Sequence, residues 1–292
     1  MREAPRSEGG ATPLAEATRR LSTHTFHGGR VEEGPDHLAV EEPLEIRVIA
    51  ERAGRREPYP LAVTMRTPGS DFELAIGFLL TEGILPDPGA VVRVAYCESG
   101  PPEAAGNVVE VTVAPGVGVD LERHRRNVYT TSSCGVCGKS SLDRVRVACE
   151  PMLGGVPSVD HNTIQRLPQR LAVGQAAFAR TGGIHAAALF TPRGEPLVVR
   201  EDVGRHNAVD KVVGFLALAG HLPARQGLLL VSGRASFELV QKAAVAGIPF
   251  LAAVGAASSL AAETAAALGM TLVGFLRDER FVVYAGRERI AG

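Results

Sequence analysis

Apolar residues recur in short alternating runs through the first half of the chain, a pattern typical of strands that bury one face. Runs of this kind span residues 38–50, 59–65, 91–97 and 108–113. Between the second and third runs, residues 72–81 place apolar side chains at the i, i+3, i+4, i+7 spacing of a helix that packs against a sheet, and Gly83 ends it. This half is predicted to mix α and β structure.

The last third alternates buried-type strands with helices. Short glycine-bearing turns at Gly247 and Gly269 separate the two kinds of element, as in right-handed parallel βαβ units. The predicted strands are 228–231, 249–254 and 271–275, and the helices between them are 237–246 and 260–268. Further helices are predicted at 163–179, where Pro168 can cause a break, and at 209–218.

These patterns predict an α/β fold class with a mixed N-terminal lobe and a C-terminal lobe built from parallel βαβ units. Residues 1–22 have prolines, glycines and scattered charges without a sustained apolar period, so a disordered leader is expected. The predicted divisions are the leader 1–22, an α+β lobe 23–122, a mobile polar loop 123–145 and an α/β lobe 146–292.

Composition and charge limit the classes of partner and the cellular compartment. The 292 residues include 31 basic and 32 acidic side chains, so no overall field favours a nucleic-acid partner. Apolar runs such as 227–231 and 248–254 are far shorter than the roughly 20 residues that cross a bilayer. With only four cysteines and no secretory leader, a soluble protein of the reducing cytoplasm, without a membrane partner, is expected.

Two of the cysteines, Cys134 and Cys137, form a Cys-x-x-Cys pair in a polar segment. The second thiol of such a pair can lower the pKa of the first or resolve a covalent sulfur adduct. The pair suits redox exchange, metal binding or a persulfide. Two inert structural cysteines are less favoured, because the flanking Ser, Gly and Lys residues do not resemble a core segment.

A metal site is not predicted. Zinc needs two more ligands, and the remaining candidates could contribute only by a coincidence of folding: Cys97, Cys149, His124 and His161. The zinc deaminase signature also fails, because Ser133 stands where proline is required and His185 follows the cysteines and lacks the glutamate. A thioredoxin-type pair would follow a strand and begin a helix, whereas this pair is placed on a loop.

A second group of polar and glycine residues comprises 181–185 and 201–211, at the start of an apolar helix. Such a group is costly to order unless it forms a network or meets a ligand. The alternative is a helix cap at Asn207, with His206 hydrogen-bonded inside the protein. The two interpretations stay open on the sequence alone.

Two charged segments follow predicted strands. Arg234, in Ser232-Gly233-Arg234, lies between a strand and a helix, where backbone N–H groups and a guanidinium could bind a phosphate, although an ordinary turn is nearly as plausible. Residues 275–280 lie at the carboxyl end of the last parallel strand, where ligands of open α/β sheets bind. Their arginines could hold a pyrophosphate and their carboxylates a guanine, but on chemistry alone a solvated charged turn is the favoured interpretation.

In order along the chain, the motifs at 133–138, 181–186, 201–211, 232–234 and 274–277 resemble those of the FdhD family, the formate dehydrogenase accessory sulfurtransferases. The resemblance covers residues 38–290, and the run from Glu201 to Lys211 is its most specific part. It implies a fold similar to that of cytidine deaminases, without their zinc, and a homodimer.

The resemblance also implies a function. Members accept sulfur from a cysteine desulfurase and deliver it to the molybdenum of the bis(molybdopterin guanine dinucleotide) cofactor, before the cofactor enters formate dehydrogenase. Cys134 would carry the persulfide and Cys137 would assist. The cofactor, as bound substrate that GDP could mimic, would be held by Phe275, Leu276, Arg277, Asp278, Glu279 and Arg280. A cofactor-binding chaperone without sulfur transfer and a structural zinc protein are the alternatives.

Overall fold

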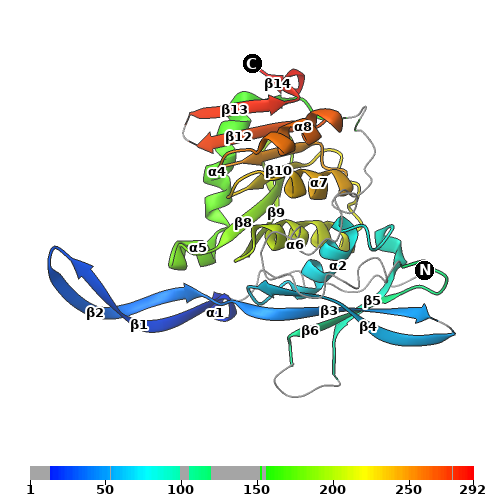
Figure 1. Cartoon of the computed structure of the whole chain (residues 1–292). Helices are drawn as coiled ribbons and strands as arrows, with labels where there is room; N and C mark the ends of the chain where they lie inside the picture. The colour runs from blue at the N-terminus through cyan, green and yellow to red at the C-terminus, as the bar shows by residue number, and fades with distance from the viewer. Residues whose placement is uncertain (1–13, 53, 99–104, 120–151, 153–155, 278) are drawn as a thin grey trace.

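The computed structural model describes residues 14–52, 54–98, 105–119, 152, 156–277 and 279–292. Two lobes pack against each other through a pair of helices, and a long two-stranded ribbon projects from one side (Figure 1). The predicted loop 123–145, with both motif cysteines, lies outside the described residues. No helix in the described part of the chain is long and apolar enough to cross a membrane.

The N-terminal lobe is a four-stranded sheet of order β4-β3-β6-β5, covered on one face by a helix. Its central strand alternates as predicted, so that Leu44, Ile46 and Val48 are buried. β3 pairs parallel with β6 and antiparallel with β4. The elements are β3 (Glu42–Arg52), β4 (Arg55–Arg66), α2 (Asp71–Thr81), η1 (Pro88–Ala90), β5 (Val91–Tyr96) and β6 (Val108–Val113).

The C-terminal lobe is a six-stranded sheet of order β13-β12-β11-β10-β8-β9. Its central strands β10, β11 and β12 are parallel, which confirms the direction predicted for them. The strands are β8 (His185–Phe190), β9 (Pro196–Asp202), β10 (Leu228–Val231), β11 (Phe250–Ala253), β12 (Thr271–Arg277) and β13 (Arg280–Ala285).

Helices cover both faces of this sheet, so its central strands are buried on both sides and read as continuous apolar runs. Leu229 and Leu251 contribute to one core with α6, α7 and α8, while Leu228 and Phe250 contribute to the other with α4. Figure 1 shows the two helix layers. The helices are α4 (His161–Val173), α5 (Ala176–Thr181), α6 (Arg205–Leu218), α7 (Phe237–Val245) and α8 (Ser259–Ala267).

The remaining described elements lie at the ends of the chain. The projecting ribbon pairs β1 (Thr18–His27) with β2 (Arg30–Ala39) in antiparallel register after the short α1 (Leu14–Ala17). Residues 14–22 are therefore helical and extended, where the sequence predicted disorder. Both faces of the ribbon are largely exposed, so its strands lack the apolar alternation that would have revealed them. At the other end, β14 (Ile290–Ala291) follows η5 (Arg287–Arg289) and pairs with β7 (Val159–Asp160).

Two predicted helices have different ends in the structure. The single helix expected at 163–179 is two helices, and the break falls at Gly174 and Gln175, because α4 continues through Pro168. The helix expected at 209–218 begins four residues earlier, at Arg205, so polar residues of the 201–211 group lie within its first turns. Polar first turns hide helix starts from a search for apolar periodicity.

Candidate functional site

The two lobes meet where α2 crosses α6 at a pair of glycines. A Cβ on Gly77 would overlap the backbone carbonyl of Asp210, and one on Gly214 would overlap that of Glu73. The helix backbones are therefore in direct contact, which only glycine allows at both positions. This contact holds the start of α6 against the N-terminal lobe.

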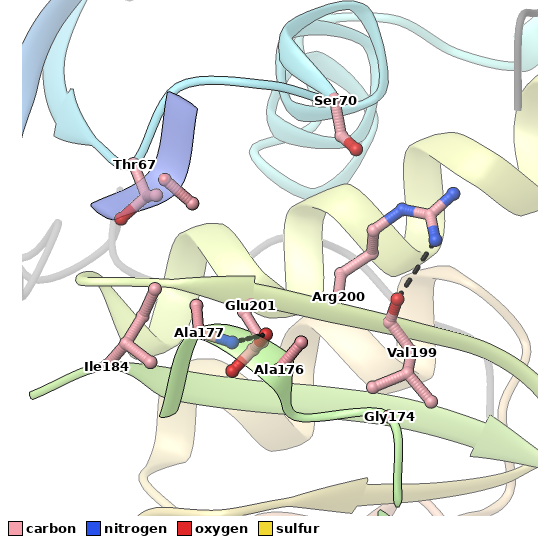
Figure 2. A pocket seen from close by; sticks show the side chains of 10 residues that line it. Thr67, Ser70, Gly174, Ala176, Ala177, Ile184, Val199, Arg200 and Glu201 are labelled. Carbon is pink, nitrogen blue, oxygen red and sulfur yellow. Dashed lines mark hydrogen bonds between the residues drawn. The ribbon is translucent and has the colours of Figure 1, made fainter. Parts of the chain in front are cut away.

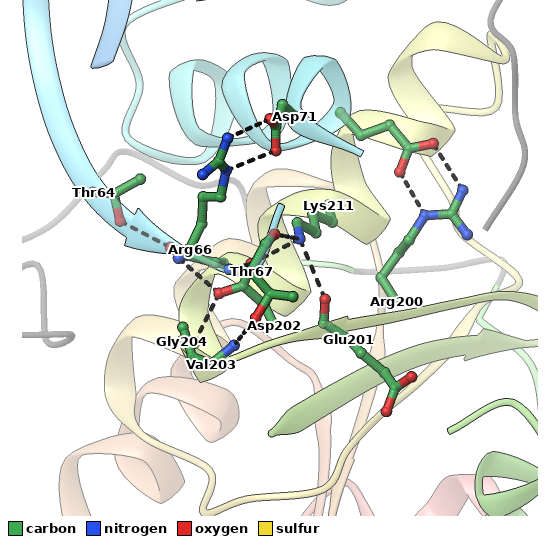
Figure 3. Close-up of polar contacts among 12 residues, drawn as sticks. Thr64, Arg66, Thr67, Asp71, Arg200, Glu201, Asp202, Val203, Gly204 and Lys211 are labelled. Carbon is green, nitrogen blue, oxygen red and sulfur yellow. Dashed lines mark hydrogen bonds and ion pairs between the residues drawn. The ribbon is translucent and has the colours of Figure 1, made fainter. Parts of the chain in front are cut away.

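Buried charges connect the lobes beside this crossing (Figure 3). The Nζ atom of Lys211 lies 2.8 Å from a carboxylate oxygen of Asp202 and donates to the carbonyl oxygen of Thr67. Asp202 also accepts from the backbone N–H of Thr67. A second pair joins Arg200 to Glu73 through two hydrogen bonds of 2.6 and 2.7 Å. β9, α6 and the end of β4 are thus tied together.

A further buried network lies deeper in the interface. Lys242 of α7 donates to Asp210 of α6 and to the hydroxyl of Thr81 of α2, which itself donates to Asp210. Burial raises the pKa of Asp210, and the nearby Lys242 ammonium opposes this rise. Burial lowers the pKa of Lys242, but the Asp210 carboxylate raises it, and the net shift is upward. Three helices therefore share one ion pair.

The sequence left open whether residues 201–211 form a network or ligand site, or a helix cap at Asn207. These contacts show a network between the lobes for most of the group. Asn207 does not cap α6: its side-chain N–H donates to the carbonyl of Met65 and to Asp202, and Gly204 stands at the N-cap. His206 pairs with Glu238 at 2.8 Å. Asp202, Asn207, Asp210 and Lys211 hold the lobes together, so they are structural residues.

A small cavity of about 80 Å³ lies at the same junction (Figure 2). Glu201 lines it, and its carboxylate accepts hydrogen bonds from the backbone N–H groups of Ala177 and Phe178 at the start of α5. Ser70 also lines it, and its buried hydroxyl finds no partner among the described residues. The volume suits a few ordered waters and is too small for a substrate.

The carboxyl edge of the C-terminal sheet brings two predicted segments side by side. The backbone N–H of Gly255, after β11, donates to the carbonyl of Gly233, after β10, at 2.9 Å. The N–H of Phe275 in β12 donates in turn to the carbonyl of Gly255 at 2.8 Å. The turn that carries Arg234 and the segment that begins at Phe275 therefore occupy neighbouring strand ends, at the edge where open α/β sheets bind ligands.

The motif at 181–185 joins this edge as well. Because β8 runs antiparallel to β10, His185 at its start lies beside the turn after β10. A Cβ built on Gly233 would lie 3.5 Å from the His185 ring and 3.8 Å from the Arg205 side chain. Burial and the nearby Arg205 guanidinium lower the pKa of His185, so its imidazole is neutral at pH 7.

The predicted cofactor-binding residues differ in what they can offer a ligand. Arg234, Arg277, Glu279 and Arg280 are exposed. Phe275 is partly buried and adopts a left-handed backbone conformation with φ of 51°, which is strained for a residue other than glycine and is common at functional sites.

The other two predicted residues of this segment offer less. The side chain of Leu276 is wholly buried in the core, so only its backbone could meet a ligand. Asp278 lies outside the described residues. The amide of Gln165 in α4 donates to the carbonyl of Glu279 at 2.8 Å, which holds Glu279 beside α4.

Neither motif cysteine can be placed, because Cys134 and Cys137 lie outside the described residues, as do Cys149 and His124. Cys97 and His161 are described: Cys97 lies 3.8 Å from a guanidinium nitrogen of Arg47, and His161 contacts the carbonyl of Ala291. Across the described ranges, no group of three or more His, Cys, Asp or Glu side chains is placed to hold a metal ion.

Several residues of the lobe junction were not identified from the sequence. Glu73, Arg200, Lys242 and Glu238 lie in or beside apolar runs, where a charged residue is normally read as part of an exposed face. Their partners are distant in sequence, as for Arg200 and Glu73, which are 127 residues apart. The one signal in the sequence that could have identified these buried residues was a charged residue within an apolar run.

Comparison with known proteins agrees with the family resemblance seen in the sequence motifs. Residues 39–291 match the model of the FdhD/NarQ family. The chain is 51% identical over 282 residues to the "Sulfur carrier protein FdhD" of Streptomyces avermitilis, covering 95% of this chain and 97% of that protein. It is 52% identical over 262 residues to the protein of the same name from Mycobacterium tuberculosis, covering 88% of this chain and 92% of the relative.

The fold also matches a crystal structure. A formate dehydrogenase accessory protein from Desulfotalea psychrophila superposes with a TM-score of 0.69 at 23% identity, covering 94% of this chain and all of that one. At this identity the likeness shows the mixed α/β fold. The predicted likeness to cytidine deaminases stays a prediction.

Proposed function

The chain belongs to the FdhD/NarQ family, and from this premise we propose that it is a sulfurtransferase serving formate dehydrogenase. It takes persulfide sulfur from a cysteine desulfurase and transfers it to the molybdenum of the bis(molybdopterin guanine dinucleotide) cofactor. The names of its relatives, which describe sulfur carriers, support the first half of this proposal.

One observation supports the second half of the proposal, which is the binding of the cofactor that receives the sulfur. The hydrogen bonds from Phe275 to Gly255 and from Gly255 to Gly233 hold Arg234 and the 275–280 segment at one sheet edge. Exposed guanidinium groups at strand ends suit the pyrophosphate of a dinucleotide, and Glu279 can accept from the N–H groups of a guanine. GDP, which contains both features, serves as a mimic of the substrate.

The sulfur step follows from thiol chemistry. The Cys134 thiolate attacks the terminal sulfur of the desulfurase persulfide, the S–S bond breaks, and the donor cysteine leaves as a thiolate. Cys134 then carries the sulfur as a persulfide. Cys137 assists transfer or stabilises the loaded form, and no resident metal takes part.

Mass spectrometry tests this step. After incubation with a cysteine desulfurase and free cysteine, intact wild-type protein gains the mass of one sulfur atom, and Cys134→Ala does not. Cys97→Ala is the matched control, because Cys97 lies in the N-terminal lobe beside Arg47 and the proposed transfer does not use it. Wild type without an adduct contradicts the sulfur-carrier proposal.

A cofactor-binding chaperone without sulfur transfer is the second candidate. It is favoured by one observation: the contacts that group the nucleotide-suited sheet edge, from Phe275 to Gly255 and from Gly255 to Gly233, involve no motif cysteine. Such a protein binds GDP, shows no sulfur adduct, and supports formate dehydrogenase maturation equally well in Cys134→Ala.

A homodimer in the cytoplasm is part of the proposal. The β1–β2 ribbon supports it, because an isolated two-stranded hairpin is marginally stable in water and this one exposes Phe26 and Val31 at its tip. Light scattering should give twice the chain mass for wild type and a lower mass for Phe26→Ser. A monomeric wild type contradicts the dimer.

A further inference from the structure

The β1–β2 ribbon has two outer edges, and neither pairs with another strand in the described part of the chain. Each strand is ten residues long, and the ribbon projects from one side of the lobes (Figure 1). At its base, Ala17 and Ala39 pack with Ala177 of α5. An unpaired edge presents a row of backbone N–H and C=O groups to which a further strand can bond, so the ribbon is a candidate interaction surface.

Pro35 of β2 reveals which backbone groups of the ribbon point outward. It lies opposite Ser22 in a register that runs without a shift along both strands. Proline has no N–H to donate to the ladder, so this is a pair whose backbone groups point away from each other. The orientation alternates along a strand, and Arg20 and His24 therefore also present their N–H and C=O groups outward. Among the described residues, none outside the ribbon bonds to these groups.

The two outer edges differ in their ability to take a further strand. On β2, Pro35 interrupts the row of outward donors, which is one way in which proteins protect an exposed edge from pairing. β1 contains neither proline nor glycine, and threonines, which favour strands, recur along it. Arg20, Ser22 and His24 are exposed. The outer edge of β1 is therefore the one that is open to pairing.

The side chains of β1 select the kind of strand that fits beside it. β1 contains two arginines and no acidic residue. Across the ribbon, Arg20 faces His37, so β2 supplies no carboxylate opposite it. Leu21, on the other face, is 45% exposed. Facing residues of opposite charge stabilise a strand pair, as do facing apolar residues. A strand that alternates acidic and apolar side chains therefore complements β1.

A second copy of this chain complements the edge poorly. Two β1 strands side by side would combine two arginines from each strand with no acidic residue. The β2 strand of a second copy would offer the edge that Pro35 interrupts. The proposed dimer contact involves Phe26 and Val31 at the tip of the ribbon. It therefore leaves the edge at residues 20–24 to a different partner.

We propose that the outer edge of β1 binds an extended acidic segment of a partner protein, which becomes the third strand of the ribbon. The outward N–H and C=O groups of Arg20, Ser22 and His24 bond to the main chain of the segment and provide affinity. A carboxylate opposite Arg20 and an apolar side chain opposite Leu21 provide selectivity. This surface is separate from the carboxyl edge of the C-terminal sheet and uses neither motif cysteine.

Two variants of the full-length protein test the edge. Ser22→Pro removes the outward N–H opposite Pro35 and keeps the ladder to β2, so β1 gains the interruption that β2 already has. Ser22→Ala is the matched control, because it loses the side-chain bond to Glu33 but keeps the backbone N–H. Arg20→Glu reverses the outward charge and leaves the backbone unchanged. Slow hydrogen exchange at the inward N–H groups of Leu21 and Thr23 shows that the ribbon still forms.

The probe is a short fluorescein-labelled peptide in which Glu and Val alternate, and its charge-reversed counterpart alternates Lys and Val. Wild type and Ser22→Ala should bind the Glu peptide, measured by fluorescence polarisation, and exchange should slow at Arg20, Ser22 and His24. Ser22→Pro should weaken this binding by about tenfold, the usual effect of one lost hydrogen bond. Arg20→Glu should bind the Lys peptide more tightly than the Glu peptide.

Equal affinity of Ser22→Pro and Ser22→Ala for the Glu peptide overturns the proposal, since the peptide is then not held by the strand edge. Wild type that binds neither peptide, or both equally, overturns it as well. Slow exchange at Arg20, Ser22 and His24 in the protein alone, increasing with protein concentration, assigns the edge to a second copy and likewise contradicts an acidic partner.

Discussion

Lys242 on α7 lies 2.9 Å from a carboxylate oxygen of Asp210 on α6, and both side chains are buried. Thr81 of α2 bonds to both partners. The ion pair thus lies where α2, α6 and α7 meet, and it couples the N-terminal lobe to the sheet that carries the candidate site.

Lys242→Met should lower the free energy of unfolding by about 3–5 kcal/mol, because it leaves the Asp210 carboxylate buried without its cation. Urea unfolding monitored by circular dichroism measures the change. The double variant Asp210→Leu/Lys242→Met removes both charges and should recover most of the loss. A single variant as stable as wild type would show that the pair contributes nothing.

Gly214→Ala should destabilise the protein by about 1–3 kcal/mol or more, since its Cβ would overlap the carbonyl of Glu73 and push α2 from α6. Thermal unfolding measures the shift. Gly118→Ala is the control, because nothing lies within 4 Å of a Cβ there, and it should leave the midpoint nearly unchanged. Equal midpoints for the two variants would mean that the helices can separate freely.

Arg277→Ala should leave stability within about 0.5 kcal/mol of wild type, because the side chain is exposed. The affinity of the Arg277→Ala variant for GDP should fall by about tenfold or more, the usual effect of losing a charged hydrogen bond to phosphate. Calorimetric titration measures both proteins. Arg225→Ala, at the opposite edge of the sheet, should bind GDP as wild type does; if it weakens binding equally, the site is not at the carboxyl edge.

The lowered pKa of His185 predicts a pH dependence of stability. The unfolded chain binds this proton more readily than the folded one, so stability is fully present above the ordinary histidine pKa of about 6.5 and declines as pH falls through the lower folded pKa. The urea concentration at the unfolding midpoint is measured between pH 5 and 8. It should fall less on acidification in His185→Asn than in wild type, because the variant lacks this proton-binding group. His221→Asn, exposed at the far edge, should behave as wild type.

The central βαβ elements of the C-terminal lobe followed from the chain pattern, because a strand buried on both faces needs an unbroken apolar run, whereas β8, β9 and β13 were not predicted. β10, β11 and α7 lie within a residue or two of their predicted positions. The β1–β2 ribbon did not follow, since an element with both faces exposed has no apolar period to read.

The candidate site divides in the same way. Arg234 and Phe275 were predicted as site residues from the sequence because each stands at the end of an apolar strand, and the structure brings these two strand ends to one edge. The structural role of Asp202, Asp210 and Lys211 was not decidable there, because it depends on partners in another lobe.

The sequence by itself determined the family, the parallel direction of the central strands and the thiol pair that the proposed chemistry requires, because local periodicity and short motifs carry that information directly. Only the tertiary structure decided which polar residues hold the lobes together and which remain available to a ligand. That distinction rests on hydrogen bonds between residues more than a hundred positions apart, such as Thr67 to Asp202 and Lys211, and no local pattern specifies them.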